Sequence, residues 1–333
     1  MFTKKRLLRI PVAVIVILLL SQPAFSQPNI VDLGTLGGPH SNAYAINDKG
    51  QVVGWSYTAS GEMHGFLWSA ATGMQDLGAL GGADSVAKSV NNQGQVVGYS
   101  DTASDAPHAF LWTAKSGMQD LGTLGGTFSA AYGINDQGQV VGYSDTASGE
   151  RHAFLWTAKG GMQDLGTLGG TYSAAYGIND QGQVVGFSYT ASGERHAFLW
   201  KAIDGMHDLG TLGGQVIYAL GINDQGQVVG WGYTASDAPH AFLWSAATGM
   251  RDLGTLGGTY SAAYGVGDQG QVVGSSYTAT GERYAFLRGA ATGMRSLSTL
   301  GGTDSSASGI NARGQMVGYS YTASGELHAC LWP

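Results

Sequence analysis

The chain has 333 residues, of which 55 are glycine, and only 12% are Asp, Glu, Lys or Arg. Glycine is therefore more than twice as common as in an average soluble protein, and charge is about half as common. The formal net charge of −7 argues against nucleic acid or an anionic membrane surface as a partner, while the hydrophobic share of 43% is enough for a packed core.

Residues 1–26 differ from the rest of the chain. Four basic residues precede an apolar run over 10–20, and Ala24-Phe25-Ser26 carries the small residues of a cleavage site. This pattern predicts a cleaved signal peptide over 1–26 and a secreted or extracellular protein, with the periplasm as the alternative. This run is too short for a membrane-spanning helix and no other stretch approaches that length, so we expect no span after cleavage. The single cysteine, Cys330, cannot form an internal disulfide.

Residues 27–333 form one predicted domain of seven 44-residue repeats without insertions. The motif Asp-Leu begins at Asp32, Asp76, Asp120, Asp164, Asp208 and Asp252, and Ser296 takes the seventh place. A period of this length is typical of propeller blades or of helical repeats. Glycine recurs too often for helices, which favours blades.

Each repeat contains four short runs of β type. In the third repeat they are Met118–Thr123, Ala131–Asn135, Gln139–Ser144 and His152–Thr157. Turn sequences separate the last three runs, and the glycine-rich stretch 124–130 is interpreted as a flexible crossing between blades. One repeat therefore predicts one four-stranded blade.

The chain ends favour a closed ring. A lone first strand at 30–34 starts the domain, and the chain stops at 331–333, where the next such strand is needed. We therefore predict an all-β fold: a seven-bladed β-propeller of four-stranded antiparallel blades, closed by pairing the N-terminal strand with the three C-terminal strands. The main alternative is a β-solenoid. In the propeller, the Asp-Leu strand is outermost, and the crossing and hairpin loops lie on one face.

Three motifs, HAFLW at His152–Trp156, GMQDLGTLGG at Gly161–Gly170 and GINDQGQVVG at Gly177–Gly186, resemble the bacterial extracellular HAF repeat family, named after His-Ala-Phe. The resemblance covers nearly all of 30–333 and implies a secreted bacterial protein. It transfers no catalytic residue. This sequence departs from the family motifs mainly in the sixth repeat and directly after it, at Gly267, Tyr284, Arg288, Ser296 and Ser298.

A histidine opens the HAF strand in six repeats, and Tyr284 replaces it in the other. We expect these histidines to be structural, each bonded within its blade to the Asp of the Asp-Leu motif; a metal ring is the alternative. They are His64, His108, His152, His196, His240 and His328. The NDQG turns lack the ligand spacing of a calcium loop, so we expect no metal and no cofactor.

Sequence variation is concentrated in the crossing and hairpin loops, where aromatic and charged residues suit sugar or peptide binding. The alternative is that these residues bind no ligand, because surface loops are in general polar and variable. The candidate ligand-binding residues are Phe128, Tyr172 and Tyr260 in the crossing, and Tyr57, Tyr189, Tyr233, Tyr277, Tyr321, Glu150, Arg151, Glu194, Arg195, Glu282 and Arg283 around the hairpin.

No catalytic motif occurs, and nearly every titratable residue is copied around the ring. The unmatched ones are interpreted as solvated surface variation: His40, Asp84, Lys88, Asp204, His207, Arg288, Asp304 and Arg313. The favoured hypothesis is a monomeric, non-enzymatic propeller with several similar sites for glycans or extracellular polymers. One alternative is an envelope scaffold that binds another protein. The other is a hydrolase or lyase acting at the central channel.

Overall fold

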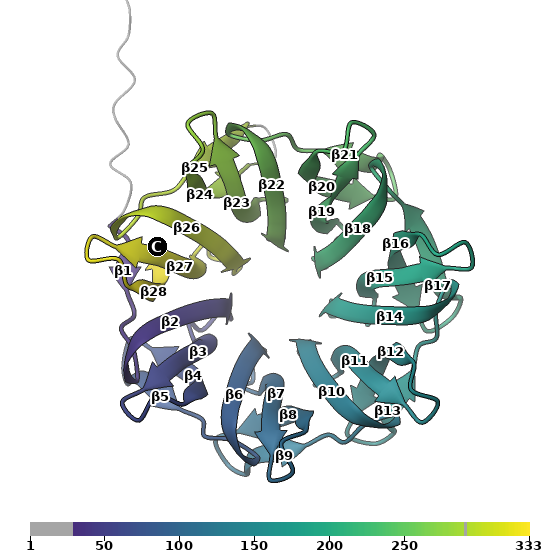
Figure 1. The fold of residues 1–333 in the computed structure, drawn as a ribbon, viewed down its shortest axis with the longest axis horizontal. Coiled ribbons are helices and arrows are strands. Elements are labelled where there is room, and N and C mark those ends of the chain that lie inside the picture. Colours follow the sequence, from purple (N-terminus) through teal and green to yellow (C-terminus); the bar gives the residue numbers. More distant parts are fainter. Residues whose placement is uncertain (1–28, 290–291) are drawn as a thin grey trace, which may run out of the picture.

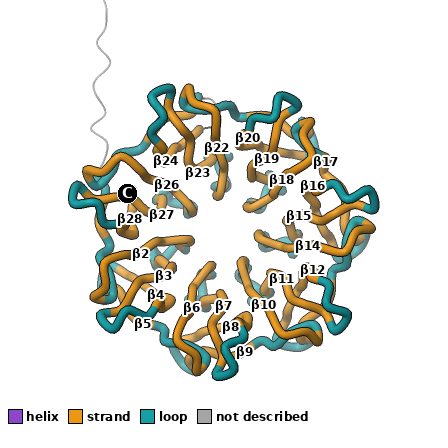
Figure 2. The backbone as a smooth tube through the Cα atoms, in the orientation of Figure 1, coloured by secondary structure: helices purple, strands orange, loops and turns teal. Residues whose placement is uncertain are grey.

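The computed structural model describes residues 29–289 and 292–333, and the predicted signal peptide lies outside them. Seven four-stranded blades surround a central axis (Figure 1), so the predicted seven-bladed propeller is confirmed. The strands surround an open centre and most loops lie at the periphery (Figure 2). None of the described residues belongs to a helix that could span a membrane.

Each blade places its longest strand next to the axis, followed by the strand that carries the QVVG motif. The innermost strands are β2 (Gly37–Ile46), β6 (Gly81–Val90), β10 (Gly125–Ile134), β14 (Gly169–Ile178), β18 (Gly213–Ile222), β22 (Gly257–Val266) and β26 (Gly301–Ile310). The second strands are β3 (Val52–Thr58), β7 (Val96–Thr102), β11 (Val140–Thr146), β15 (Val184–Thr190), β19 (Val228–Thr234), β23 (Val272–Thr278) and β27 (Met316–Thr322).

The HAF strand is third and the Asp-Leu strand is outermost, as predicted. The third strands are β4 (Met63–Ser69), β8 (Pro107–Thr113), β12 (Arg151–Thr157), β16 (Arg195–Lys201), β20 (Pro239–Ser245), β24 (Arg283–Arg288) and β28 (Leu327–Trp332). The outermost strands are β5 (Gly73–Asp76), β9 (Gly117–Asp120), β13 (Gly161–Asp164), β17 (Gly205–Gly210), β21 (Gly249–Asp252), β25 (Met294–Ser296) and β1 (Val31–Asp32).

The two ends of the domain complete the seventh blade. Strand β1 pairs antiparallel with β28, so that Val31 lies opposite Leu331. The order across this blade is β1-β28-β27-β26, which mixes one strand from the start of the chain with three from its end. This pairing is the predicted closure, and it leaves no unpaired edge at the point where the ring is joined.

The core lies between neighbouring blades. Around β12, the side chains of Phe154 and Ala131 pack against Val97 and Leu111 of the preceding blade. Phe154 is fully buried, as are its counterparts in the other blades, including Cys330 in the seventh. Both faces of each blade are covered, which explains why the FLW and VVG runs are continuously apolar.

The predicted second run, Ala131–Asn135, was too short, because β10 already begins at Gly125. The last two glycines of the GTLGG crossing therefore belong to this strand, and Leu124 forms a bridge to Thr146. Gly125 has a φ of +101°, which favours glycine. In the next strand, a Cβ on Gly142 would lie 1.9 Å from the carbonyl oxygen of Ala130, so this position accepts only glycine.

Candidate functional site

The two faces of the propeller differ in their loops. One face carries the loops that join the second and third strands, and we call it the hairpin face. The crossing segments lie on the same face, because Leu124 bridges to Thr146 at the base of the hairpin. The opposite face carries the NDQG turns, and we call it the turn face.

The repeated histidines make the predicted bond within each blade. His152 Nδ1 lies 2.8 Å from Asp164 Oδ2, and the other carboxylate oxygen accepts a bond from the backbone N–H of Gly166. A carboxylate only accepts, so Nδ1 carries the proton. The six pairs are His64–Asp76, His108–Asp120, His152–Asp164, His196–Asp208, His240–Asp252 and His328–Asp32.

The His328 pair joins the two ends of the domain across the closure. In the sixth blade, Tyr284 and Ser296 occupy the positions that His and Asp hold in the other blades. No hydrogen bond joins these two side chains among the described residues, so this blade lacks the bond. No group of His, Cys, Asp and Glu in the described ranges could hold a metal ion.

Phe128, Tyr172 and Arg151 come together on the hairpin face. Phe128 stacks on Tyr143 with 5.6 Å between ring centroids, and the guanidinium of Arg151 lies 4.6 Å from the Phe128 centroid. The same guanidinium lies 6.0 Å from the Tyr172 ring of the next blade. Arg151 also donates from Nε to Asp145 at 2.7 Å, which holds it in place.

The next blade repeats this arrangement. Tyr172 stacks on Phe187 at 5.3 Å, and Tyr189 meets Tyr172 edge-on at 6.0 Å. The Arg195 guanidinium lies 4.7 Å from Phe187, and it donates hydrogen bonds to the hydroxyls of Tyr189 and Tyr218. Together, these side chains of the two blades form the aromatic–arginine cluster, in which Phe187 is buried and the others are half-buried: Phe128, Tyr143, Arg151, Tyr172, Phe187, Tyr189 and Arg195.

The remaining candidate aromatics each pack beside a further aromatic ring. Two of them, Tyr233 and Tyr260, connect to this cluster through Trp231, which stacks on Tyr218 at 4.7 Å, and Tyr218 lies 5.0 Å from Phe187. Tyr57 packs on Trp55, Tyr233 on Trp231, Tyr260 on Tyr277 and Tyr321 on Tyr319, with centroid distances from 5.4 to 6.5 Å. All are half-buried.

Arg283 forms an ion pair with Asp304 at 2.9 Å and also contacts Tyr319. Its charge is therefore already neutralised, unlike that of Arg195, which makes no salt bridge with any described residue.

The glutamates lie away from these rings. Glu150, Glu194 and Glu282 are exposed at the hairpin. The Glu150 carboxylate is 3.8 Å from His152 Nε2, on the opposite side of the strand from Arg151, because successive side chains alternate. The structure therefore brings the arginines onto the aromatic rings, and it does not bring the glutamates there.

Sequence reasoning missed the lining of the central channel. One position of each innermost strand faces the axis and forms what we call the channel ring: Tyr44, Lys88, Tyr132, Tyr176, Leu220, Tyr264 and Ser308. These residues line an open cavity of about 570 Å³. The sequence did contain one signal for this lining, because tyrosine occupies the same repeat position in four of the seven copies.

Lys88 is not solvated surface variation, contrary to the expectation from the sequence. Its Nζ lies 3.7 Å from the Tyr44 centroid and between the rings of Tyr99 and Tyr132, at 5.7 and 5.6 Å. Burial lowers the pKa of Lys88 to about 8.

Three further residues of that unmatched set also make contacts. Asp84 accepts a hydrogen bond from the backbone of Met63, His40 accepts one from Leu327, and Asp304 holds Arg283. In contrast, Asp204 and His207 form an exposed pair with each other.

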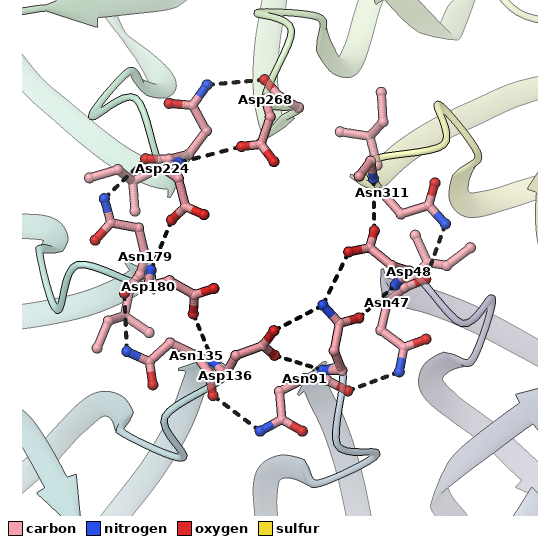
Figure 3. Close-up of a pocket in the computed structure, with 18 of the residues that line it drawn as sticks. Asn47, Asp48, Asn91, Asn135, Asp136, Asn179, Asp180, Asp224, Asp268 and Asn311 are labelled. Carbon is pink, nitrogen blue, oxygen red and sulfur yellow. Dashed lines mark hydrogen bonds between the residues drawn. The ribbon is translucent and has the colours of Figure 1, made fainter.

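A second ring surrounds the axis on the turn face (Figure 3). Asn135 caps its own turn through Oδ1, which accepts from the Gln139 N–H, while its Nδ2 donates to the Asn179 carbonyl of the next blade at 3.0 Å. Asp180 Oδ1 likewise accepts from the Asp136 backbone at 2.8 Å. The predicted turn chemistry is therefore present, and the same side chains also link the blades.

This turn-face ring opens between the sixth and seventh blades. Asn223 reaches the Gly267 carbonyl, but Gly267 has no side chain with which to reach Asn311. Ala312 similarly replaces an acidic or amide residue at the next position. Asn311 itself bonds to Asn47 at 3.0 Å and so closes the ring across the chain ends.

No family model matches this chain, and no curated protein sequence matches it significantly. Solved structures with the same fold include the β-propeller domain of the Trilobed protease from Pyrococcus furiosus, at 8% identity and a TM-score of 0.58, covering 88% of this chain and 95% of that one. The BP39L lectin from Burkholderia pseudomallei follows at 9% identity and 0.53, covering 88% and 96%.

TolB from Acinetobacter baumannii reaches 10% identity and a TM-score of 0.51, covering 78% of this chain and 66% of that one. At these identities, the similarities establish the propeller fold and nothing finer.

Proposed function

We propose that this protein is an exported, non-enzymatic binding propeller whose hairpin face engages glycans or surface polymers. The observation that carries the proposal is the aromatic–arginine cluster, in which partly exposed rings of two successive blades are held in place by stacked guanidinium groups.

The chemistry of the cluster suits a carbohydrate. Aromatic faces stack on the apolar faces of sugar rings, and arginine N–H groups donate to hydroxyl oxygens. The rings already lie in fixed positions, as the 2.7 Å bond between Arg151 and Asp145 illustrates, so little conformational entropy is lost on binding.

The blades do not offer seven equal sites. The first residue of the third strand is arginine in three blades, Arg151, Arg195 and Arg283, and methionine, proline or leucine in the others. We therefore expect up to three unequal sites. Even so, linking sites on one face multiplies weak affinity by about 10²–10⁴ for a polymeric ligand.

The lining of the central cavity argues against a glycoside hydrolase acting there. The titratable residues that line its described part are Lys88, Arg283 and tyrosines, and no carboxylate is among them. The carboxylate pair on which most glycoside hydrolases depend is therefore missing there. The lectin similarity is compatible with glycan binding, but it rests on the fold alone.

A glycan and bacterial-polysaccharide array, run with and without a calcium chelator, tests the proposal. We expect reproducible binding to a set of related sugars that is insensitive to the chelator. The triple variant Phe128→Ala, Tyr172→Ala, Tyr260→Ala should lose this binding.

The matched control replaces the exposed glutamates of the same face, as Glu150→Gln, Glu194→Gln and Glu282→Gln, and should bind normally. A blank array, or unchanged binding by the folded aromatic variant, would refute the proposal.

A second candidate function is a scaffold that binds another protein. The observation in its favour is the packing of the aromatic rings, which stack on one another and so form a broad, half-buried surface. Aromatic and arginine side chains are also the residues enriched at protein interfaces. A blank array, together with one partner footprint on the hairpin face, would favour this function.

The HAF resemblance also stays a proposal. It is supported by the match between the 44-residue period and one blade, since His152 and Asp164 of one repeat bond within a single blade. Finding the three motifs in the same order in other exported bacterial chains would test it.

A further inference from the structure

The channel ring combines one ammonium group with neutral aromatic rings. Its four tyrosines come from different blades, and Lys88 is its only cationic member among the seven. Burial raises the pKa of Tyr44, Tyr132 and Tyr176, so these phenols remain neutral and supply no counter-charge.

The ammonium group of Lys88 lacks an anionic partner. No carboxylate of the described residues forms a salt bridge with it; its neighbours are the rings of Tyr44, Tyr99 and Tyr132. Cation–π contact offsets only part of the cost of removing an ammonium from water. A charge in this environment is therefore most stable when a ligand brings an anion to it.

The turn-face end of the channel is acidic. The mouth at the turn face is ringed by Asp48, Asp136, Asp180, Asp224 and Asp268. A layer of Ile and Val side chains, which includes Ile46 and Ile134, separates that mouth from the channel ring. An anion is therefore repelled from the turn face and reaches Lys88 from the hairpin face, where Asp304 balances the charge of Arg283, which lines the cavity.

We propose that the channel cavity binds one acidic sugar unit, with its carboxylate on Lys88 Nζ and its ring against the channel-ring tyrosines. The volume of about 570 Å³ falls within the range of small-molecule sites. This inference rests on the proposed glycan function and names the class of sugar. It adds a single axial site to the sites of the outer cluster.

Calorimetric titration with oligouronates and with their methyl esters tests the inference. The ester keeps the shape of the sugar and removes its charge. Because a hydrogen bond to a charged group contributes about 1.5–3 kcal/mol, we expect the acid to bind roughly 10- to 100-fold more tightly than the ester, with one site per chain. A sulfated neutral sugar distinguishes carboxylate recognition from general anion binding.

Lys88→Met should abolish the preference for the acid, while the exposed Lys49→Met control should keep it. Lys88→Arg restores the charge but not the fit, and it should retain part of the preference. Equal binding of acid and ester, no binding of the acid, or an undiminished preference in folded Lys88→Met would each overturn the inference. A sulfated sugar that binds as well as the acid would overturn its carboxylate part.

The outcomes separate this inference from the proposed function. Binding of neutral glycans without any preference for acids refutes the channel site and leaves the outer sites standing. An unsaturated product, detected by its ultraviolet absorbance, would support the acidic ligand and refute the non-enzymatic function. Binding of simple carboxylates as tight as that of oligouronates would leave the charge recognition intact and refute its sugar part.

Discussion

Replacing Lys88 by methionine should stabilise the protein at neutral pH. The change keeps an unbranched side chain in the channel and removes the buried charge. Burial lowers the pKa of Lys88 from 10.5 to about 8, which corresponds to a cost of about 3 kcal/mol whenever both the folded and the unfolded chain carry the proton. The lost cation–π contact with Tyr44 offsets about 1–2 kcal/mol, so we expect a net gain of about 1–2 kcal/mol at pH 7.

The pH dependence gives this prediction its sign. Below pH 8 both states of the wild-type protein are protonated, and the folded state bears the full cost. Between pH 8 and 10.5 the folded state has released the proton and the unfolded chain has not, so wild-type stability rises relative to the variant. The stability difference between Lys88→Met and the wild type should therefore fall by about 2–3 kcal/mol by pH 10.5, which removes the advantage of the variant or turns it into a small disadvantage.

Urea unfolding, followed by tryptophan fluorescence at several pH values, measures both quantities. Tyrosine ionisation affects the two proteins alike and cancels in the difference. Lys49→Met, at an exposed site, should show no pH-dependent difference. A Lys88→Met protein that is less stable at pH 7, or whose advantage is the same at pH 10.5, would refute the account of Lys88 as a buried charge.

Three substitutions test the packing of the blades by thermal and urea unfolding. Gly142→Ala should lower the free energy of unfolding by more than about 3 kcal/mol, because the added Cβ would lie 1.9 Å from a carbonyl oxygen. A soluble variant of unchanged stability would show that the two strands do not approach each other so closely. Gly267→Asn should add up to about 1 kcal/mol by supplying the missing link to Asn311, and a loss of stability would contradict the role given to the turn-face ring. His328→Ala should cost about 1 kcal/mol and speed opening at the chain ends, measured by hydrogen exchange of β1; unchanged exchange there would mean that the bond does not hold the closure.

The architecture was predictable because it is encoded locally and repeated. The constant spacing gave the number of blades, and the unpaired strand at 30–34 gave the closure observed between Val31 and Leu331. The bond between His152 and Asp164 was predictable as well, because both residues recur with every blade and their strands are adjacent.

The channel could not be predicted, because its composition depends on which face of the innermost strand meets the axis. Tyr132 at this position looks like an ordinary strand aromatic, and Lys88 looks like one exception on a variable surface. Only the packing of three consecutive blades places Lys88 close to tyrosines that are 44 residues away on either side. The bond from Asn135 to Asn179 was hidden for the same reason, since it joins equivalent residues of neighbouring repeats.

The aromatic–arginine cluster was predictable in part. Loop variation selected Phe128, Arg151 and Tyr172 as candidates, and the structure places these three side chains together. The same variation also selected Glu150, which faces His152 instead of the rings. Strand alternation separates the two sets, and it depends on where the strand begins, which was uncertain by a residue in the sequence.

The stoichiometry of ligand binding tests the central claim most directly. Calorimetric titration of the purified protein, with the sugar that gives the strongest array signal, reports both the number of sites and any release of product. The account predicts more than one site per chain and an unaltered ligand. A single site with turnover of the sugar would contradict it.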